Sequence, residues 1–123
     1  MKKAVIVDEA RFSRICSAIL EGEGCGSNVV SRIRELPEAL SHHEAGLVIT
    51  SYPYGANILD AIKRSNIPAI ILFDQIDEHI FEVLSGVNNT YCMVKPLNYQ
   101  QFKDLVKRLL SGTAAHRGGF SIV

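Results

Sequence analysis

The sequence lacks an excess of charge of either sign, a long apolar run and any low-complexity segment. Thirteen Lys and Arg residues balance thirteen Asp and Glu residues, which removes the usual electrostatic basis for non-specific binding to nucleic acids or anionic membranes. No apolar run approaches the roughly 20 residues that a membrane span requires. Met1-Lys2-Lys3 leads directly into a short strand and then acids, so we expect no signal peptide.

Cysteine is scarce too. Cys16, Cys25 and Cys92 are odd in number and fit no metal-ligand or redox spacing, which predicts buried thiols in a reducing cytoplasm. The adjacent His42 and His43 argue against a shared metal site, because neighbouring residues on a helix point in different directions. At 123 residues the chain is long enough for one domain with a single core.

Short apolar runs alternate with helical patterns along the chain. The runs are continuously apolar, which is typical of parallel strands that are covered on both faces. We expect strands at 4–8, 28–31, 47–50, 69–73 and 91–94, and helices around 12–20, 37–40, 58–62, 80–84 and 102–110. Strict alternation predicts a doubly wound α/β sheet. Residues 113–123 contain two adjacent glycines and little pattern, so we expect a flexible C-terminal tail after a domain of residues 1–112.

Functional groups of such sheets gather beyond the carboxyl ends of the strands. The residues that fall at those ends here are Asp8, Glu9, Ser51, Phe73, Asp74 and Lys95. Polar strand ends are common in any α/β protein, so topology alone does not assign them a role.

Three segments, in this order, carry a resemblance to a known family: Val7-Asp8-Glu9, Ile67–Leu72 and Val94-Lys95-Pro96. Together they resemble the receiver domain of two-component response regulators over about residues 3–112. The resemblance implies a flavodoxin-like (βα)5 fold with a five-stranded parallel sheet in the order 2-1-3-4-5. It also implies that acids after the first strand hold Mg²⁺ and that an aspartate after the third strand accepts a phosphoryl group.

The acceptor position of the family holds Ser51 in this chain. Asp8 and Glu9 keep two of three expected acids, but a neutral hydroxyl replaces the third, so we expect Mg²⁺ binding to be weak or lost and no cofactor to be required. A serine hydroxyl is also a poor nucleophile without an adjacent base. The resemblance therefore points to a degenerate receiver domain.

Two further positions depart from the family pattern. Phe73 stands where the family has a small hydroxyl residue, and Cys92 stands where it has a switch aromatic. If the two side chains meet, Phe73 could fill the space of the moving aromatic and fix one packing arrangement. Tyr91 is the alternative aromatic, although one strand step should turn it to the opposite face. Pro53 comes early, which indicates a shortened loop after the third strand.

Lys95 matches the family lysine that contacts the phosphoryl group. Without phosphate, a partly buried ammonium still requires a partner. Asp8 is the first candidate and Asp74 the second, and the sequence does not choose between them.

The sequence thus predicts a non-enzymatic, cytoplasmic signalling domain that works by protein–protein contact, independently of phosphorylation. The resemblance implies a partner surface that comprises the helix near 80–84, the strand at 91–94 and the helix at 102–110, and a homodimer is possible as well. Two alternatives stay open. One is a phosphorylatable regulator that uses Ser51 or a nearby acid such as Asp74, and the other is a small-molecule-binding flavodoxin-like module.

Overall fold

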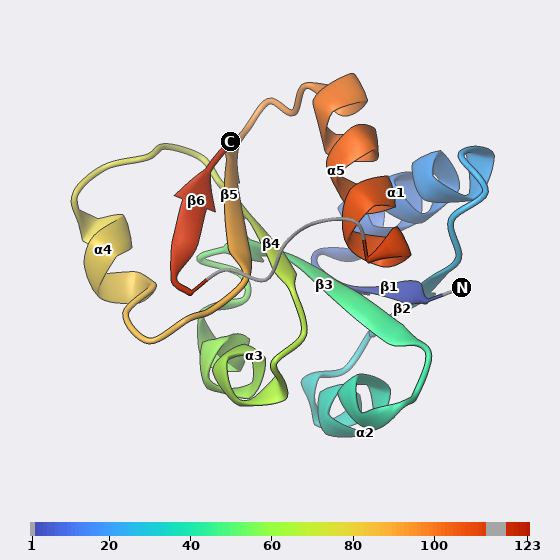
Figure 1. Cartoon of the computed structure of the whole chain (residues 1–123), viewed down its shortest axis with the longest axis horizontal. Coiled ribbons are helices and arrows are strands. Elements are labelled where there is room, and N and C mark those ends of the chain that lie inside the picture. Colours follow the sequence, from blue (N-terminus) through green and yellow to red (C-terminus); the bar gives the residue numbers. More distant parts are fainter. Residues whose placement is uncertain (1, 113–117) are drawn as a thin grey trace.

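The computed structural model describes residues 2–112 and 118–123, and in these residues helices alternate with strands (Figure 1). The strands are β1 (Lys3–Val7), β2 (Ser27–Val29), β3 (Ala45–Tyr52), β4 (Ala69–Phe73), β5 (Thr90–Val94) and β6 (Phe120–Ile122). The α-helices are α1 (Ala10–Gly22), α2 (Leu36–Ser41), α3 (Leu59–Ser65), α4 (His79–Val83) and α5 (Tyr99–Ser111). Two 3-10 turns, η1 (Ile33–Glu35) and η2 (Ala56–Ile58), precede α2 and α3. Each strand and helix expected from the sequence up to residue 112 is present.

All six strands pair in parallel in the order β2-β1-β3-β4-β5-β6. The first five follow the predicted order 2-1-3-4-5, and the flavodoxin-like fold is confirmed. In the register of the central strands, Val7 lies beside Thr50 and Ser51 beside Leu72. This register brings the residues that follow β1 next to the end of β3.

Alternate strand residues supply two separate cores. Ala4 and Ile6 of β1 pack with Leu20 of α1 and Phe102 of α5, whereas Val5 and Val7 pack toward α2 and α3. A third cluster lies under α4. Figure 1 shows α1 and α5 on one side of the sheet and α2 and α3 on the other. Such double coverage explains why the strands are continuously apolar rather than alternating.

Helix α5 has well-defined ends that its sequence predicts. The Asn98 side chain accepts a hydrogen bond from the Gln101 backbone N–H at 3.0 Å, an N-cap that contributes about 1 kcal/mol. At the other end Gly112 adopts a left-handed conformation with φ of 75°, which glycine tolerates without a Cβ clash. The predicted stop at Gly112 is confirmed.

The prediction of a flexible tail over residues 113–123 is wrong for residues 118–123, while residues 113–117 lie outside the described residues. Phe120, Ser121 and Ile122 form β6 and pair with Thr90, Tyr91 and Cys92 of β5. The Val123 N–H extends the ladder with a hydrogen bond to the Cys92 carbonyl at 2.8 Å. The sheet therefore has six strands rather than five, and β6 covers the edge of β5.

None of the helices within the described residues is both long enough and apolar enough to cross a membrane.

Candidate functional site

The carboxyl ends of β1, β3, β4 and β5 surround one hollow of about 330 Å³. Its lining comprises Asp8, Glu9, Ser51, Tyr52, Pro53, Tyr54, Asp74 and Lys95. Five of the seven residues predicted for the site thus meet at one cavity, and the other two, Phe73 and Cys92, lie buried in the core under α4. The roles assigned to all seven stay predictions.

Asp8 and Ser51 form the polar centre of this hollow. The Ser51 hydroxyl donates a hydrogen bond to Asp8 Oδ2 at 2.5 Å, and the Glu9 backbone N–H donates to Asp8 Oδ1 at 2.8 Å. Asp8 is only 5% exposed and Ser51 only 3%, so this bond is shielded from water. Both carboxylate oxygens are therefore satisfied by neutral donors. A second carboxylate in place of Ser51 would repel Asp8 instead of donating to it.

The polar pair rests on the register of β1 and β3. Thr50 lies opposite Val7, and its hydroxyl donates to the Val7 carbonyl at 2.7 Å. The Ser13 hydroxyl of α1 donates to the Asp8 carbonyl at 3.1 Å. These bonds fix the backbone on both sides of Asp8, so its carboxylate is held toward Ser51.

The donor set is a poor match for Mg²⁺, which the fold family implies at this place. Mg²⁺ prefers octahedral oxygen ligation with one or two carboxylates that are free to coordinate. Here the Asp8 oxygens already accept two hydrogen bonds, Ser51 offers a neutral hydroxyl that donates to Asp8, and Glu9 is exposed. We therefore assign no step to a metal ion at this site.

The loop after β3 closes tightly over the hollow. The Gly55 N–H donates to the Ser51 carbonyl at 2.6 Å, and a Cβ at residue 55 would lie 2.2 Å from Thr50 Oγ1. Only glycine permits this approach. Pro53 follows a cis peptide bond within the same loop.

Lys95 does not form the ion pair that the sequence suggested. Within the described residues, neither Asp8 nor Asp74 comes within ion-pairing distance of its ammonium group. The ammonium instead lies 5.3 Å from the centre of the Phe12 ring of α1, a cation–π contact. Lys95 is half-buried and lines the hollow.

Phe73 and Cys92 both belong to the third core cluster, and in the register of β4 and β5 it is Ile71, two residues before Phe73, that lies beside Cys92. The fixed-packing hypothesis stays a prediction. Phe73 is 3% exposed and Cys92 is fully buried. Tyr91 packs against the first core cluster, so it points to the opposite face of the sheet, as the strand alternation predicted. Burial raises the pKa of the Cys92 thiol to about 12, so the thiol stays protonated at neutral pH.

Tyr52 is a site residue that the sequence analysis missed. Its ring centre lies 5.6 Å from that of Phe73, and its hydroxyl lies 3.3 Å from His79 Nε2. The residue also borders a second hollow of about 320 Å³ against α4, with Asp74 and Asp77 at its rim. The sequence feature that could have identified Tyr52 is its position directly after Ser51, at the end of the third strand. Tyr52 and Phe73 together supply the aromatic packing beside the site.

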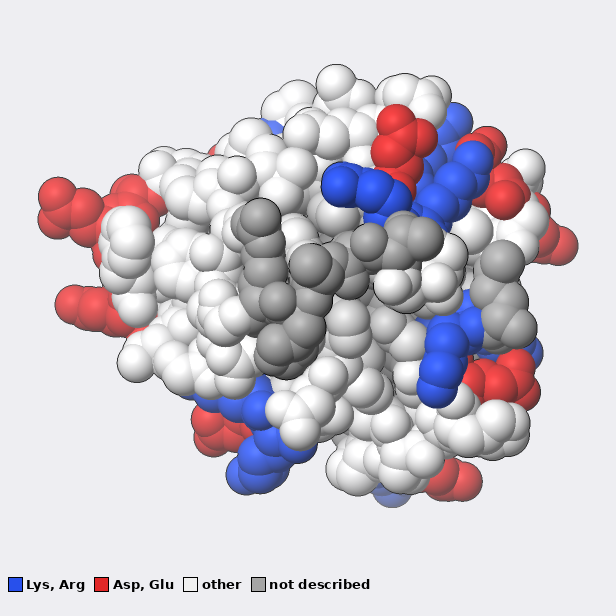
Figure 2. Space-filling view, viewed as in Figure 1, with Lys and Arg blue, Asp and Glu red and all other residues white. Residues whose placement is uncertain are grey.

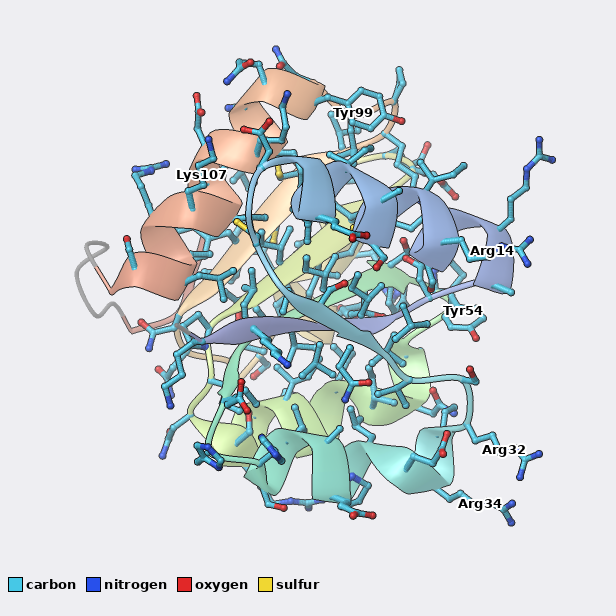
Figure 3. The ribbon with its side chains drawn as sticks, turned by 90° about the vertical axis from the view of Figure 1, so that its right-hand side faces the viewer. Arg14, Arg32, Arg34, Tyr54, Tyr99 and Lys107 are labelled. Carbon is cyan, nitrogen blue, oxygen red and sulfur yellow. The ribbon has the colours of Figure 1, made fainter. Side chains whose placement is uncertain are left out.

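Three arginines lie on the same side of the molecule as the site. Figure 3 shows Arg14 of α1 and Arg32 and Arg34 projecting into solvent from the same side of the molecule as Tyr54, which lines the hollow. Lys107 projects from the opposite side. The acids of the site thus lie on a side of the molecule whose outermost charges include arginines.

No protein-family model matches the sequence, and no curated protein matches it. Solved structures do match. A two-component response regulator from Clostridium difficile has 16% identity and a TM-score of 0.75, over 94% of this chain and 100% of that chain. A CheY-like receiver domain protein from Methanospirillum hungatei JF-1 has 20% identity and a TM-score of 0.70, over 91% of this chain and 95% of that chain. The beryllofluoride-activated NtrC4 receiver domain dimer has 20% identity and a TM-score of 0.72, over 93% of this chain and 100% of that chain.

The chain has the fold of receiver domains. The expectation drawn from Asp8-Glu9 and Lys95-Pro96 is confirmed at this level, because likenesses at these identities establish the fold.

Proposed function

We propose that this chain is a receiver-like signalling domain of a two-component-type system that acts through protein contact without accepting a phosphoryl group. One observation carries the proposal: Ser51, at the position that matches the family's acceptor, donates a hydrogen bond from its hydroxyl to Asp8. In an active receiver domain a carboxylate is required there as the nucleophile. A hydroxyl held by a carboxylate has a much weaker base beside it than the imidazole that usually activates serine.

The packing beside the site supports the same proposal. Switching in a receiver domain requires an aromatic side chain to move into space near the end of β4. Phe73 fills that region from β4 itself, and Tyr52 lies against it. Close-packed interiors adopt discrete arrangements rather than graded ones. The domain is therefore held in a single arrangement.

The partner surface that we propose includes α4 and β6. The predicted surface of α4, β5 and α5 needs revision, because β6 pairs with β5 and so covers its edge. On α5, Lys103 and Lys107 form ion pairs with Glu23 at 3.7 Å and 2.6 Å and are partly neutralised. Phe81 of α4, by contrast, is 64% exposed, and its ring centre lies 5.7 Å from that of Phe120.

The charge around α4 indicates the kind of partner. Residues 65–94 contain four acids, Asp74, Asp77, Glu78 and Glu82, and no Lys or Arg. Figure 2 shows Asp and Glu side chains at the left edge over α4, whereas Lys and Arg gather at the upper right over α5. A partner with an apolar contact residue and basic neighbours would complement this surface. NtrC4 is a dimer in its solved structure, and a second copy is a further candidate here.

We place the domain in the cytoplasm. Its three cysteines are all free and buried, as expected of a protein that folds in a reducing compartment.

The proposal is tested by incubating the full chain with acetyl phosphate and Mg²⁺ and measuring its intact mass. We expect no phosphoryl adduct on the wild-type chain. The matched variant Ser51→Asp, which restores the acceptor carboxylate, shows whether the rest of the site can still support transfer. An adduct on the wild-type chain, mapped to Ser51 or Asp74, would replace this proposal with the phosphorylatable alternative.

A further inference from the structure

His42, His43 and Glu44 converge at the opposite end of the sheet from the site described above. Their potential ligand atoms all lie within 4.8 Å of one another. The expectation that the two histidines point apart assumed a helix, but α2 ends at Ser41 and His42 has an extended backbone with φ of −67° and ψ of 135°. The two imidazole rings consequently stack, with centres 4.6 Å apart and planes inclined by 23°.

The backbone and a neighbouring lysine hold Glu44 in this arrangement. Its N–H donates to His42 Nδ1 at 3.2 Å, which closes the turn between α2 and β3. Lys3 Nζ lies 3.6 Å from Glu44 Oε2, whereas Glu44 Oε1 lies 3.9 Å from His43 Nε2. One carboxylate oxygen is thus anchored by the lysine, and the other faces the imidazole.

A hollow of about 260 Å³ adjoins the cluster and gives access to it. Both His42 and Glu44 line this hollow, together with Ser27 and Asn28 of β2. The side-chain oxygens of the two β2 residues can hydrogen-bond to water molecules that complete the coordination of an ion. The place is therefore concave and polar, not a flat surface.

We propose that His42, His43 and Glu44 form a binding site for a divalent transition-metal ion of the Zn²⁺ class. Two imidazoles and one carboxylate make up a donor set that suits Zn²⁺, Ni²⁺ or Cu²⁺ and leaves a coordination position for water. The charges of Lys2 and Lys3 oppose any cation, and Lys2 Nζ donates to the His43 carbonyl at 2.5 Å. Hard ions such as Mg²⁺ gain little from imidazole, so these lysines exclude them more effectively than Zn²⁺.

A bound ion would fix the conformation of the turn between α2 and β3. The site is independent of the proposed signalling role, because it lies at the amino ends of the strands. It would give the domain a ligand input that does not pass through Ser51.

The hydrogen bond at His42 gives this site a specific signature. In neutral His42, Nδ1 accepts the hydrogen bond from the Glu44 N–H, so Nε2 carries the ring hydrogen. A metal ion must therefore either displace the Glu44 N–H from Nδ1, or bind Nε2 and move the ring hydrogen to Nδ1. Both changes break the same hydrogen bond. The Glu44 amide resonance should therefore move on metal binding, which a purely electrostatic association with the surface would not require.

The test is a titration of the full chain with ZnCl₂, followed by amide NMR spectra and calorimetry. We expect one ion per chain, shifts centred on residues 42–44, and no comparable effect of MgCl₂. His42→Gln and His43→Gln should each weaken binding by at least about tenfold, because even indirect supports of a metal ligand commonly contribute that much. His79→Gln is the matched control, since His79 also lies beside a glutamate, Glu82, at 3.6 Å, but among the described residues it forms no cluster with a second imidazole.

His42→Gln and His43→Gln replace exposed residues, and an unchanged unfolding midpoint without metal confirms that these two variants fold. The proposal is overturned if Zn²⁺ leaves the Glu44 amide in place, or if His43→Gln binds Zn²⁺ as tightly as the wild-type chain. It is also overturned if His79→Gln removes the binding.

Discussion

Asp8 and Ser51, at the ends of β1 and β3, are joined by a hydrogen bond, whereas Phe73 of β4 and Cys92 of β5 belong to one apolar cluster. By the resemblance to receiver domains, both pairs match positions that serve the phosphoryl switch in that family. The polar pair differs from the family by one side chain, Ser51, and its surroundings still hold Asp8 in place. The apolar pair exchanges a small and a large residue, so restoring it requires the core to repack. Under the proposed function, one substitution would restore the acceptor in the β1–β3 half, whereas the β4–β5 half would have to repack before the switch could move.

The largest effect is expected from Phe73→Ala in the apolar half. The side chain is 3% exposed and packs under α4, so its removal should leave a cavity and lower the free energy of unfolding by about 3–5 kcal/mol. Denaturant unfolding measures this loss. A loss below about 1 kcal/mol would show that Phe73 does not fix the packing beside the site.

A smaller effect is expected from Ser51→Asp in the polar half. The new carboxylate would face Asp8 without a donor between them, which should cost about 1–3 kcal/mol at neutral pH. The loss should shrink as pH falls, because protonation of either carboxylate restores a hydrogen bond. Ser51→Asn has the same size without the charge and serves as the control. Equal stability of the Asp and Asn variants across pH would contradict the account of this half.

The pH dependence of stability should reflect two buried thiols, Cys16 near Asp8 and Cys92 in the apolar half. Burial, with an added contribution from the charge of Asp8, raises the pKa of Cys16 to about 12, and burial alone does so for Cys92. Because the pKa is higher in the folded state, the stabilisation is complete below the unfolded pKa near 9.0 and is lost as pH rises toward 12. At pH 9.5 we expect a loss of under about 1 kcal/mol per thiol.

Unfolding measured between pH 7.5 and 10 under reducing conditions checks this loss. Cys16→Ala and Cys92→Ala should each flatten part of the slope. An unchanged slope in both variants would show that other groups produce it.

Lys95, which lies between the two halves, should matter least to stability. It has no carboxylate within ion-pairing distance in the described part of the chain and contacts the Phe12 ring at 5.3 Å. Lys95→Met keeps the length of the side chain and should change the free energy of unfolding by less than about 1 kcal/mol. A larger destabilisation would indicate that an ion pair with Asp8 or Asp74 forms in solution.

The layered sheet could be predicted from the sequence because its determinants are local. Continuous apolar runs, helical spacing and the stop at Gly112 each mark an element without reference to the rest of the chain. Strand β6 was missed because three residues after two glycines carry no pattern of their own, and the strand depends on the distant edge of β5. The turn that brings His42 and His43 together escaped for a related reason, since the end of α2 had no glycine to mark it.

The location of the candidate site at the strand ends could be predicted from the sequence, but the contacts between its side chains could not. Asp8, Ser51 and Lys95 gather as expected because parallel strands end at one edge of the sheet. The partner of Lys95 was predicted wrongly, because a long side chain can reach either an acid or an aromatic ring within a few ångströms. The sequence contains no information on which of these it contacts.

The central claim is that the domain is held in one arrangement with no phosphoryl acceptor. Its most direct test is the amide NMR spectrum of the wild-type chain before and after addition of beryllofluoride and Mg²⁺. We predict that the resonances of Asp8, Ser51 and Lys95 and those of β4, α4 and β5 stay in place. Saturable shifts at Ser51 and Lys95 that spread into α4 would contradict the account.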